Sequence, residues 1–337
     1  MSNVDKVSVN DIRPQDLVAG QKIAVQKDID FLIAHKDEFV DVSCPACDAK
    51  SSAPRFVKNG FNYVTCNECR TFYTNPRPSA ELLEKFYASS VNYAYWNEVI
   101  FPASEAKRRE KIFVPRVDLV IDLCKTYAPQ AESLLEVGAG FGTFCEEMLA
   151  RKIFSKVVAI EPGAELAKTC RSRGIDVIEL PIEQVTFKAE DRFDVIVTFE
   201  VIEHLFSPKD FIVGCRNIVK DGGLLIITCP NGEGFDVTTL GTVSDTVDHE
   251  HLNYLNPQSL EALMKKTGFE VLSALTPGKL DAELVRNKII EGAFPVDHDP
   301  FLKRILVDDW DKIGQSFQQF LQDNLLSSNM LLIARAV

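Results

Sequence analysis

From Ser133 onward, short apolar runs alternate with helical segments, and this alternation limits the possible folds more than any other feature. The helical segments lie near Phe144–Lys152, Ala164–Arg173 and Lys209–Val219. The apolar runs are Ser133–Val137, Val157–Ile160, Ile175–Ile178, Phe193–Phe199, Leu224–Cys229, Val271–Leu275 and Leu331–Ala336. Alternating strands and helices form a parallel sheet with helices on both faces. We therefore expect an α/β fold with a Rossmann-like, seven-stranded sheet, whose edge the last run closes.

A glycine-rich turn follows the first run, with glycines at 138, 140 and 142. Glycine lets the backbone turn tightly and approach a ligand closely. The dinucleotide fingerprint G-x-G-x-x-G is not met, because Thr143 stands at its third glycine position. The second run ends on Glu161, and a carboxylate there can accept hydrogen bonds from both hydroxyls of a ribose. The alternative is a turn without a ligand, in which Glu161 is solvated.

Two Cys-x-x-Cys pairs stand close together, at Cys44 and Cys47 and at Cys66 and Cys69. Each pair can direct two thiolates at one ion, and two pairs complete a tetrahedral zinc site. Four thiolates leave no position for a substrate, so we expect a structural zinc ribbon. The alternative is a redox pair or cysteines without metal. The other cysteines lack this spacing and are expected to be buried: Cys124, Cys145, Cys170, Cys215 and Cys229.

Charge and composition exclude several functions. The net charge is −12, and such a surface repels the phosphate backbone of a nucleic acid. No apolar run approaches the roughly 20 residues that cross a bilayer. Residues Met1–Ile12 lack the apolar centre of a signal peptide. We expect a cytoplasmic protein that contacts neither membrane nor nucleic acid.

Changes in pattern predict five regions. They are an N-terminal helical segment (1–40), a zinc-ribbon module (41–80), a helical cap or linker (81–130), the α/β core (131–280), and C-terminal helices with an edge strand (281–337). Ser79 is a plausible N-cap for the helix that opens the third region. The densest basic run is expected to be a solvated helix face, or else a dock for an anionic diphosphate: Lys107, Arg108, Arg109, Lys111 and Arg116.

The core resembles the class I S-adenosylmethionine methyltransferases. The matching segments occur in the family's order: Glu136–Gly142, Ala159–Pro162, Phe193–His204 and Val219–Ile226. The resemblance implies that Gly138 and Gly140 flank the methionine part of the cofactor and that Glu161 holds its ribose. It places the turn around Ile182 near the adenine. The cofactor-binding residues that it implies are Glu136, Gly138, Gly140, Glu161, Ile182, Phe199 and Glu200, the last two beside the sulfonium.

The cysteine pairs and the run Thr74–Pro78, followed by this core, resemble bacterial sugar methyltransferases with an N-terminal zinc module. This resemblance implies a sugar or nucleotide-sugar acceptor. The chain after Leu280 is shorter than in the deoxysugar C-methyltransferases, which slightly favours O-methylation over C-methylation. Three alternatives are open: an O-methyltransferase for a small aromatic or quinone precursor, an RNA or protein methyltransferase that uses zinc for recognition, and a non-catalytic cofactor-binding partner.

A methyl sulfonium is already electrophilic, so the enzyme must align the acceptor and usually remove a proton. Bases follow the fourth strand at His204 and the fifth strand at His249-Glu250-His251. In the sugar C-methyltransferases a histidine and a Glu-His pair at these places lie in the active site. His204, Glu250 and His251 match them and are the predicted catalytic residues. A metal site in the His249–His251 loop is the alternative, although the sequence offers no evident third ligand.

Overall fold

The computed structural model describes residues 15–337, which divide into two compact units. The first, called the cysteine unit here, comprises residues 15–106, Pro230–Ser259 and Leu275–Met330. The second, the sheet unit, comprises Lys107–Cys229, Leu260–Ala274 and Leu331–Val337. The expectation for Met1–Ile12, that no signal peptide is present, lies outside the described residues.

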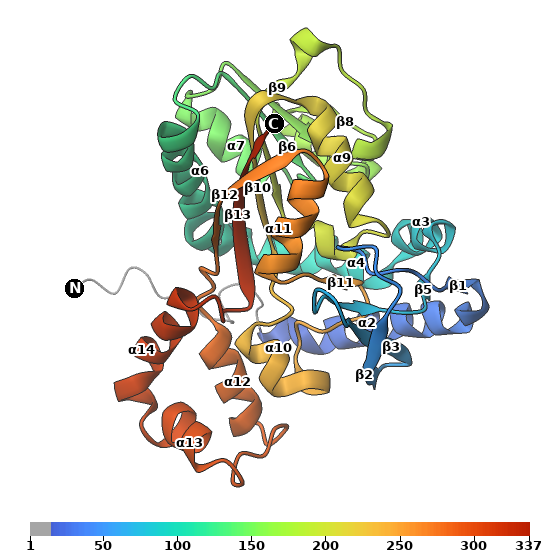
Figure 1. Ribbon diagram of the computed structural model, residues 1–337, viewed down its shortest axis with the longest axis vertical. Coiled ribbons are helices and arrows are strands. Elements are labelled where there is room, and N and C mark those ends of the chain that lie inside the picture. The colour runs from blue at the N-terminus through green and yellow to red at the C-terminus, as the bar shows by residue number, and fades with distance from the viewer. Residues whose placement is uncertain (1–14) are drawn as a thin grey trace. The chain divides into compact units, whose positions relative to one another are not determined.

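Seven strands of the sheet unit form one sheet in the order β12-β13-β10-β9-β6-β7-β8 (Figure 1). Their bounds are β6 Ser133–Val137, β7 Lys156–Ile160, β8 Asp176–Ile178, β9 Phe193–Phe199, β10 Val219–Pro230, β12 Phe269–Leu275 and β13 Asn329–Ala336. Strand β9 pairs in parallel with β6 and β10, and β7 pairs in parallel with β6 and β8. The predicted α/β fold with a seven-stranded, mostly parallel sheet is confirmed.

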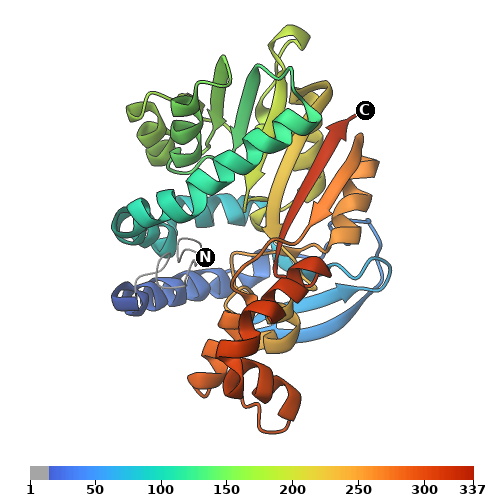
Figure 2. The ribbon, with the colours of Figure 1, turned by 90° about the vertical axis from the view of Figure 1, so that its left-hand side faces the viewer.

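Helices cover both faces of this sheet, which explains why its central strands β6 and β9 are buried at nearly every position. Helices α6 (Val114–Tyr127) and α7 (Thr143–Arg151) pack on one face, where Val120, Phe144 and Met148 join the strands in one buried core. Helices α9 (Pro208–Ile218) and α11 (Pro257–Lys266) lie on the opposite face (Figures 1 and 2). Helix α8 (Ala164–Ser172) connects β7 to β8. The glycine turn follows the last residue of β6, so it lies at the edge of the sheet where the parallel strands end.

An antiparallel sheet in the order β11-β4-β3-β2 forms the centre of the cysteine unit. The bounds are β2 Ser52–Lys58, β3 Phe61–Cys66, β4 Phe72–Thr74 and β11 Asn253–Tyr254, and β1 (Phe39–Val40) pairs with β5 (Arg77–Pro78). Strand β11 comes from residues remote in sequence, since Asn253 pairs with Tyr73 and Tyr254 with Phe72. The rings of Phe72 and Tyr254 stack 4.4 Å apart in the buried core. This pairing anchors the loop that precedes β11.

The helices of the cysteine unit form two groups. The first holds α2 (Gln15–Ala34), α3 (Ala80–Ser89), α4 (Val91–Tyr95) and α5 (Phe101–Arg108), and the second holds α10 (Phe235–Leu240), α12 (Asp281–Ile290), α13 (Pro300–Lys303) and α14 (Trp310–Asp323). Ser79 caps α3 as predicted, because its Oγ accepts a hydrogen bond from the Leu82 amide. The second group shares a core that contains Val285, Leu306 and Leu321. Within residues 15–337, no helix combines the length and the apolar content that crossing a membrane requires.

Candidate functional site

The glycine turn after β6 has a backbone that only glycine adopts easily. Gly138, Gly140 and Gly142 have φ values of +77°, +55° and +72°. A Cβ atom at position 138 would lie 2.5 Å from Val201, whereas a Cβ atom at position 140 would have no atom within 4 Å. The first glycine is therefore required by packing. The space over Gly140 is open and can receive a ligand.

Glu161 follows the last residue of β7 and fixes the glycine turn. Its Oε2 accepts a hydrogen bond from the Gly140 amide at 2.7 Å, and its Oε1 accepts one from the Gly163 amide at 2.9 Å. The side chain is 5% exposed, so Glu161 is not the solvated turn residue of the alternative interpretation. Burial raises the pKa of Glu161, and the hydrogen bonds from Gly163 and Gly140 lower it in part. An ionised carboxylate offers about four lone-pair positions, so further hydroxyl donors can still be accepted.

The end of β9 brings an arginine, a ring and a carboxylate together. The Arg116 guanidinium from α6 lies 4.3 Å from the ring centre of Phe199. Glu200 has a left-handed backbone with φ of +57°, and its Oε1 accepts a hydrogen bond from Thr228 Oγ1 at 2.6 Å. Non-glycine residues in this conformation are strained and occur more often at functional sites than elsewhere. Burial lowers the pKa of Arg116, whereas the carboxylates of Glu200 and Glu136 raise it.

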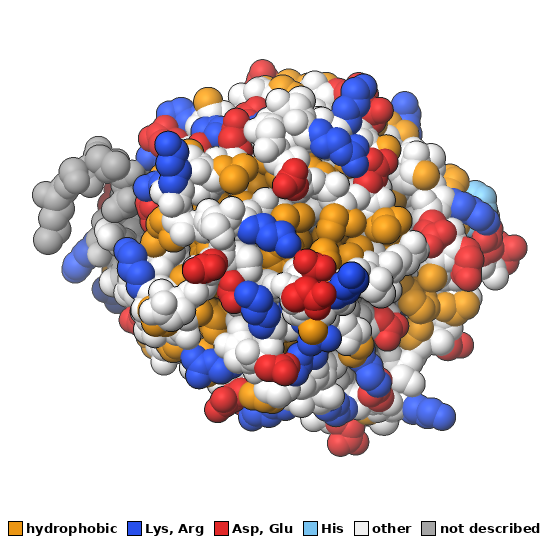
Figure 3. Space-filling model, turned by 90° about the horizontal axis from the view of Figure 1, so that it is seen from above, with side chains coloured by type: hydrophobic (Ala, Val, Ile, Leu, Met, Phe, Trp, Pro, Cys, Tyr) orange, Lys and Arg blue, Asp and Glu red, His pale blue; other side chains and the backbone are white. Residues whose placement is uncertain are grey.

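Arg116 was predicted only as a member of the basic run, which was expected to be a solvated helix face or else a dock for a diphosphate. In the described part of the chain, no carboxylate pairs with Arg116 and no oxygen accepts a hydrogen bond from it. Arg109 of the same run is paired instead, with Glu146 and Glu147 at 2.5 Å each. Acidic and basic side chains are also interspersed over the face drawn in Figure 3. The apolar neighbours of Arg116 in Val114-Pro-Arg-Val117 were the signal that it faces inward.

Two further predicted cofactor residues are buried. Glu136 on β6 accepts a hydrogen bond from Cys145 Sγ at 3.1 Å, and burial raises its pKa to about 8. Ile182 begins a short 3₁₀ turn, Ile182–Gln184, and packs against Gly214 of α9. Cys145 and the other cysteines outside the two Cys-x-x-Cys pairs are buried, as predicted.

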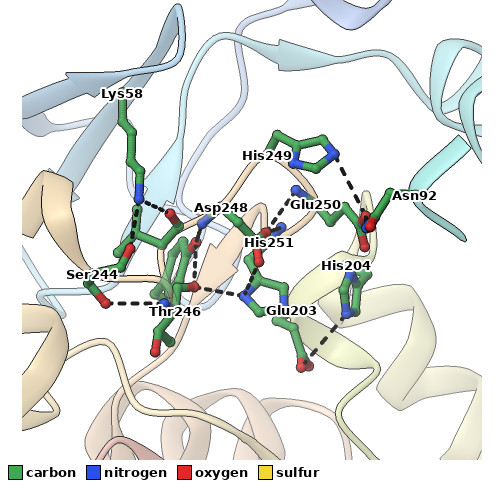
Figure 4. Close-up of polar contacts among 12 residues, drawn as sticks. Lys58, Asn92, Glu203, His204, Ser244, Thr246, Asp248, His249, Glu250 and His251 are labelled. Carbon is green, nitrogen blue, oxygen red and sulfur yellow. Dashed lines mark hydrogen bonds and ion pairs between the residues drawn. The ribbon is translucent and has the colours of Figure 1, made fainter. Parts of the chain in front are cut away.

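The three predicted catalytic residues are divided between the units. His204 lies in the sheet unit, in the turn Ile202–His204 after β9, with its Nε2 3.9 Å from Oε1 of the buried Glu203 (Figure 4). The His204 side chain is 26% exposed. Glu250 and His251 belong to the loop before β11 in the cysteine unit.

The His251 ring is oriented by its own loop. Its Nδ1 lies 2.9 Å from the carbonyl oxygen of Thr246 (Figure 4). A carbonyl oxygen only accepts, so Nδ1 carries the proton and Nε2 of the neutral ring carries the lone pair. Asp248 holds the turn, because its Oδ1 accepts hydrogen bonds from the backbone amides of Glu250 and His251. The arrangement suits a neutral base that acts through Nε2.

Glu250 sits in a buried polar cluster within the cysteine unit. Its Oε1 accepts a hydrogen bond from Asn92 Nδ2 at 2.6 Å and lies 3.7 Å from His249 Nε2. Burial raises the pKa of Glu250, and the nearby Asp248 raises it further. Asp28 of α2 lies in the same cluster and was not predicted as a site residue, whereas His249 was predicted only as part of the alternative metal site in its loop. The spacing of Ala24, Asp28 and Leu32, all buried, was the signal that this acid faces inward.

The four cysteines predicted to bind zinc lie together. Their Sγ atoms are all within 4.8 Å of one another, with Cys44 and Cys69 3.4 Å apart and Cys47 and Cys66 3.5 Å apart. Four ligands at about 2.3 Å from a tetrahedral zinc lie about 3.8 Å from one another. The cluster therefore has the size that one zinc ion requires.

The backbone repeats the same turn around each cysteine pair. The Cys44 carbonyl accepts from the Asp48 amide at 3.0 Å, and the Cys66 carbonyl accepts from the Arg70 amide at 3.1 Å. Asp48 and Arg70 both have a left-handed backbone, with φ of 65° and 60°. Two matched turns present two pairs of sulfur atoms to one point.

Residues 106–274, half of the chain, match the family model of a methyltransferase domain. An uncharacterised protein of Methanocaldococcus jannaschii is 27% identical over 184 residues, which are 52% of this chain and 84% of that one. A ubiquinone biosynthesis O-methyltransferase of Maricaulis maris is 29% identical over 170 residues, which are 46% of this chain and 64% of the relative. The match thus spans a little less than two thirds of the Maricaulis relative's length.

Among solved structures, phosphoethanolamine N-methyltransferase 2 of Haemonchus contortus, in complex with S-adenosyl-L-methionine, is 17% identical with a TM-score of 0.44. The likeness covers 65% of this chain and 52% of that one. The family match covers the glycine turn, Glu161 and the end of β9. The chain therefore belongs to the methyltransferase-domain family and is an S-adenosylmethionine-dependent methyltransferase.

Proposed function

We propose that this methyltransferase acts on a hydroxyl oxygen of a small aromatic or quinone-precursor molecule. The observation that carries the proposal is the fixed ring of His251, whose Nε2 lone pair is suited to take one hydroxyl proton. Methylation of a hydroxyl needs only one such base. The Maricaulis relative, which is named as a ubiquinone biosynthesis O-methyltransferase, supports the acceptor class.

The residues at the end of the sheet fit the cofactor. S-adenosylmethionine, when bound, supplies an electrophilic methyl group on a sulfonium sulfur. We assign Gly138 and Gly140 to the methionine part, because the space over Gly140 is open. The Glu161 carboxylate accepts hydrogen bonds from the ribose hydroxyls. The Arg116 guanidinium binds the methionine carboxylate, because no described residue accepts a hydrogen bond from this guanidinium.

The remaining cofactor residues shape the environment of the sulfonium. Phe199 and Glu200 lie at the end of β9 and Glu136 lies on the adjacent β6. The Glu200 carboxylate stabilises a nearby sulfonium cation by its charge. The buried Ile182 contributes an apolar surface on the adenine side. Each of these roles follows the resemblance residue by residue.

Three residues are assigned to the acceptor. His251 would take the proton of the acceptor hydroxyl on Nε2, and bound S-adenosylmethionine would supply the methyl group and leave as S-adenosylhomocysteine. His204, next to the Glu203 carboxylate, and Glu250 bind and orient the acceptor. General-base catalysis of this kind contributes about 10²–10⁴ in rate.

The cysteine cluster is proposed to hold one structural zinc ion. Its four sulfur atoms and the two matched turns support this assignment. Four thiolates close the coordination sphere, so zinc would stabilise the cysteine unit and take no part in methyl transfer.

The acceptor class is tested with methyl-¹³C-labelled S-adenosylmethionine and two sets of acceptors, aromatic diols and nucleotide sugars. We expect label on an oxygen of an aromatic diol, seen by NMR and mass spectrometry of the product. Label on a nucleotide sugar would support the sugar hypothesis in its place. Label on carbon would overturn O-methylation.

A further inference from the structure

A buried histidine in the cysteine unit has no hydrogen-bond partner on either ring nitrogen. His249 is 4% exposed, and no described residue hydrogen-bonds to its Nδ1 or Nε2. Its nearest carboxylate atom, Glu250 Oε1, lies 3.7 Å from Nε2, which is too long for a hydrogen bond (Figure 4). Buried polar groups are almost always satisfied. The pattern therefore indicates a ligand that accepts the imidazole lone pair.

Two carboxylates face this histidine from different segments of the cysteine unit. Asp28 comes from α2, Glu250 from the loop before β11, and one donor atom from each of these and from His249 all lie within 4.8 Å of one another. Donors at about 2.1 Å from a cation lie roughly 3–4 Å apart. Only a small contraction would bring the three onto one ion.

The carboxylates are themselves held in place. Asp28 accepts hydrogen bonds from the Val91 and Asn92 amides and from Ser90 Oγ, and Glu250 accepts one from Asn92 Nδ2. Carboxylates that bind metal are normally oriented by such outer contacts. Asn92 Oδ1 is also buried without a hydrogen-bond donor among the described residues, so the cluster contains more acceptors than the protein satisfies.

We propose that Asp28, His249 and one carboxylate oxygen of Glu250 bind one divalent transition-metal cation, which leaves the other oxygen of Glu250 for the acceptor. One imidazole and two carboxylates are the donor set that Mn²⁺, Fe²⁺, Co²⁺ and Zn²⁺ accept, and the two negative charges balance the cation. The ion would tie α2 and the start of α4 to the loop that carries His251. This site is separate in ligands and chemistry from the four-cysteine cluster.

Mn²⁺ alone is the probe, added to the full chain with its cysteine cluster saturated with zinc. Mn²⁺ prefers oxygen and nitrogen to thiolate ligands, so it reports the new site. Electron paramagnetic resonance counts the bound ion. We expect the wild-type protein to bind one Mn²⁺ ion. His249→Phe should bind Mn²⁺ at least about tenfold more weakly, because losing a metal ligand lowers metal affinity at least as much as losing a residue that only orients a ligand.

His249→Phe keeps a ring that can pack on Phe86, whose ring centre lies 6.0 Å from that of His249. The matched control is His204→Phe, which removes the imidazole of the Glu203–His204 pair and should leave Mn²⁺ affinity unchanged. Unchanged affinity in His249→Phe, or loss of binding in His204→Phe alone, overturns the assignment.

A second measurement needs no altered residue at 249. In protein with ¹⁵N-labelled histidine, pulsed paramagnetic resonance should show coupling from Mn²⁺ to a histidine nitrogen, and the coupling should persist in His204→Phe. A manganese spectrum without nitrogen coupling, or a wild-type protein that binds no Mn²⁺, contradicts the proposal. The nitrogen coupling therefore tests the proposed histidine ligand even if His249→Phe does not fold.

Discussion

The Glu161 carboxylate accepts a 2.7 Å hydrogen bond from the backbone amide of Gly140, so the end of β7 fixes the glycine turn that follows β6. Replacing Glu161 would therefore disturb the turn as well as the proposed ribose contact. Gly140 offers a cleaner probe of the cofactor, because its side of the turn is open.

Gly140→Ala should weaken S-adenosylhomocysteine binding by at least about tenfold, or 1.4 kcal/mol, measured by calorimetry. The added methyl group meets no protein atom, so a loss beyond backbone strain reports the ligand. Gly174→Ala is the matched control, since Gly174 also has a positive φ and an open Cβ position in the sheet unit. Equal effects of the two substitutions would mean that strain alone was measured.

Arg116→Ala should weaken S-adenosylhomocysteine binding by roughly 10–150-fold, which corresponds to a charged hydrogen bond of about 1.5–3 kcal/mol. The affinity for methylthioadenosine, which has no methionine carboxylate, should change little. Calorimetry with both ligands separates the two cases. A similar loss for both would place Arg116 away from the carboxylate.

Glu136 should make the cofactor-free protein less stable as the pH rises. Burial raises its folded-state pKa to about 8, while Cys145 and Arg116 lower it and Glu161 raises it further. Below the ordinary carboxyl pKa, Glu136 is protonated in both the folded and the unfolded protein. Between that value and about pH 8, only the folded protein keeps the proton. The free energy of unfolding therefore falls with rising pH, by at most about 1.4 kcal/mol per pH unit. Glu136→Gln should lack this component in denaturation curves at pH 5–8. An unchanged pH slope would contradict the assignment.

Freshly purified protein should contain one zinc ion per chain by elemental analysis. Cys47→Ser should lose the metal and lower Tm by at least about 5 °C, because the energy of structural zinc binding is largely folding energy. Cys215→Ala, a buried cysteine outside the cluster, should keep the zinc. Well under one zinc in wild type would rule out the site.

The sheet could be predicted from sequence because each strand is a local apolar run between helices. The expected run Phe193–Phe199 coincides with β9, and Ser133–Val137 coincides with β6. Glu161 and the glycine turn were found for the same reason, since they adjoin these strands. The five-region division stays a prediction.

Contacts between remote segments could not be read from the sequence. Strand β11 joins β4 through Asn253 and Tyr73, and no local pattern announces that pairing. Asp28 lies near His249 because α2 and the loop before β11 belong to one unit, and the sequence alone gave no sign of this proximity. The inward orientation of Arg116 likewise depends on the ring of Phe199.

The turnover of His251→Ala on the aromatic acceptor tests the proposed chemistry most directly. We expect kcat to fall by about 10²–10⁴ while S-adenosylhomocysteine affinity stays unchanged. His35→Ala is the control, because the His35 Nδ1 also lies against a backbone carbonyl, that of Phe31, at 2.8 Å. It should keep wild-type kcat. Wild-type turnover in His251→Ala would contradict the proposal that this histidine removes the hydroxyl proton.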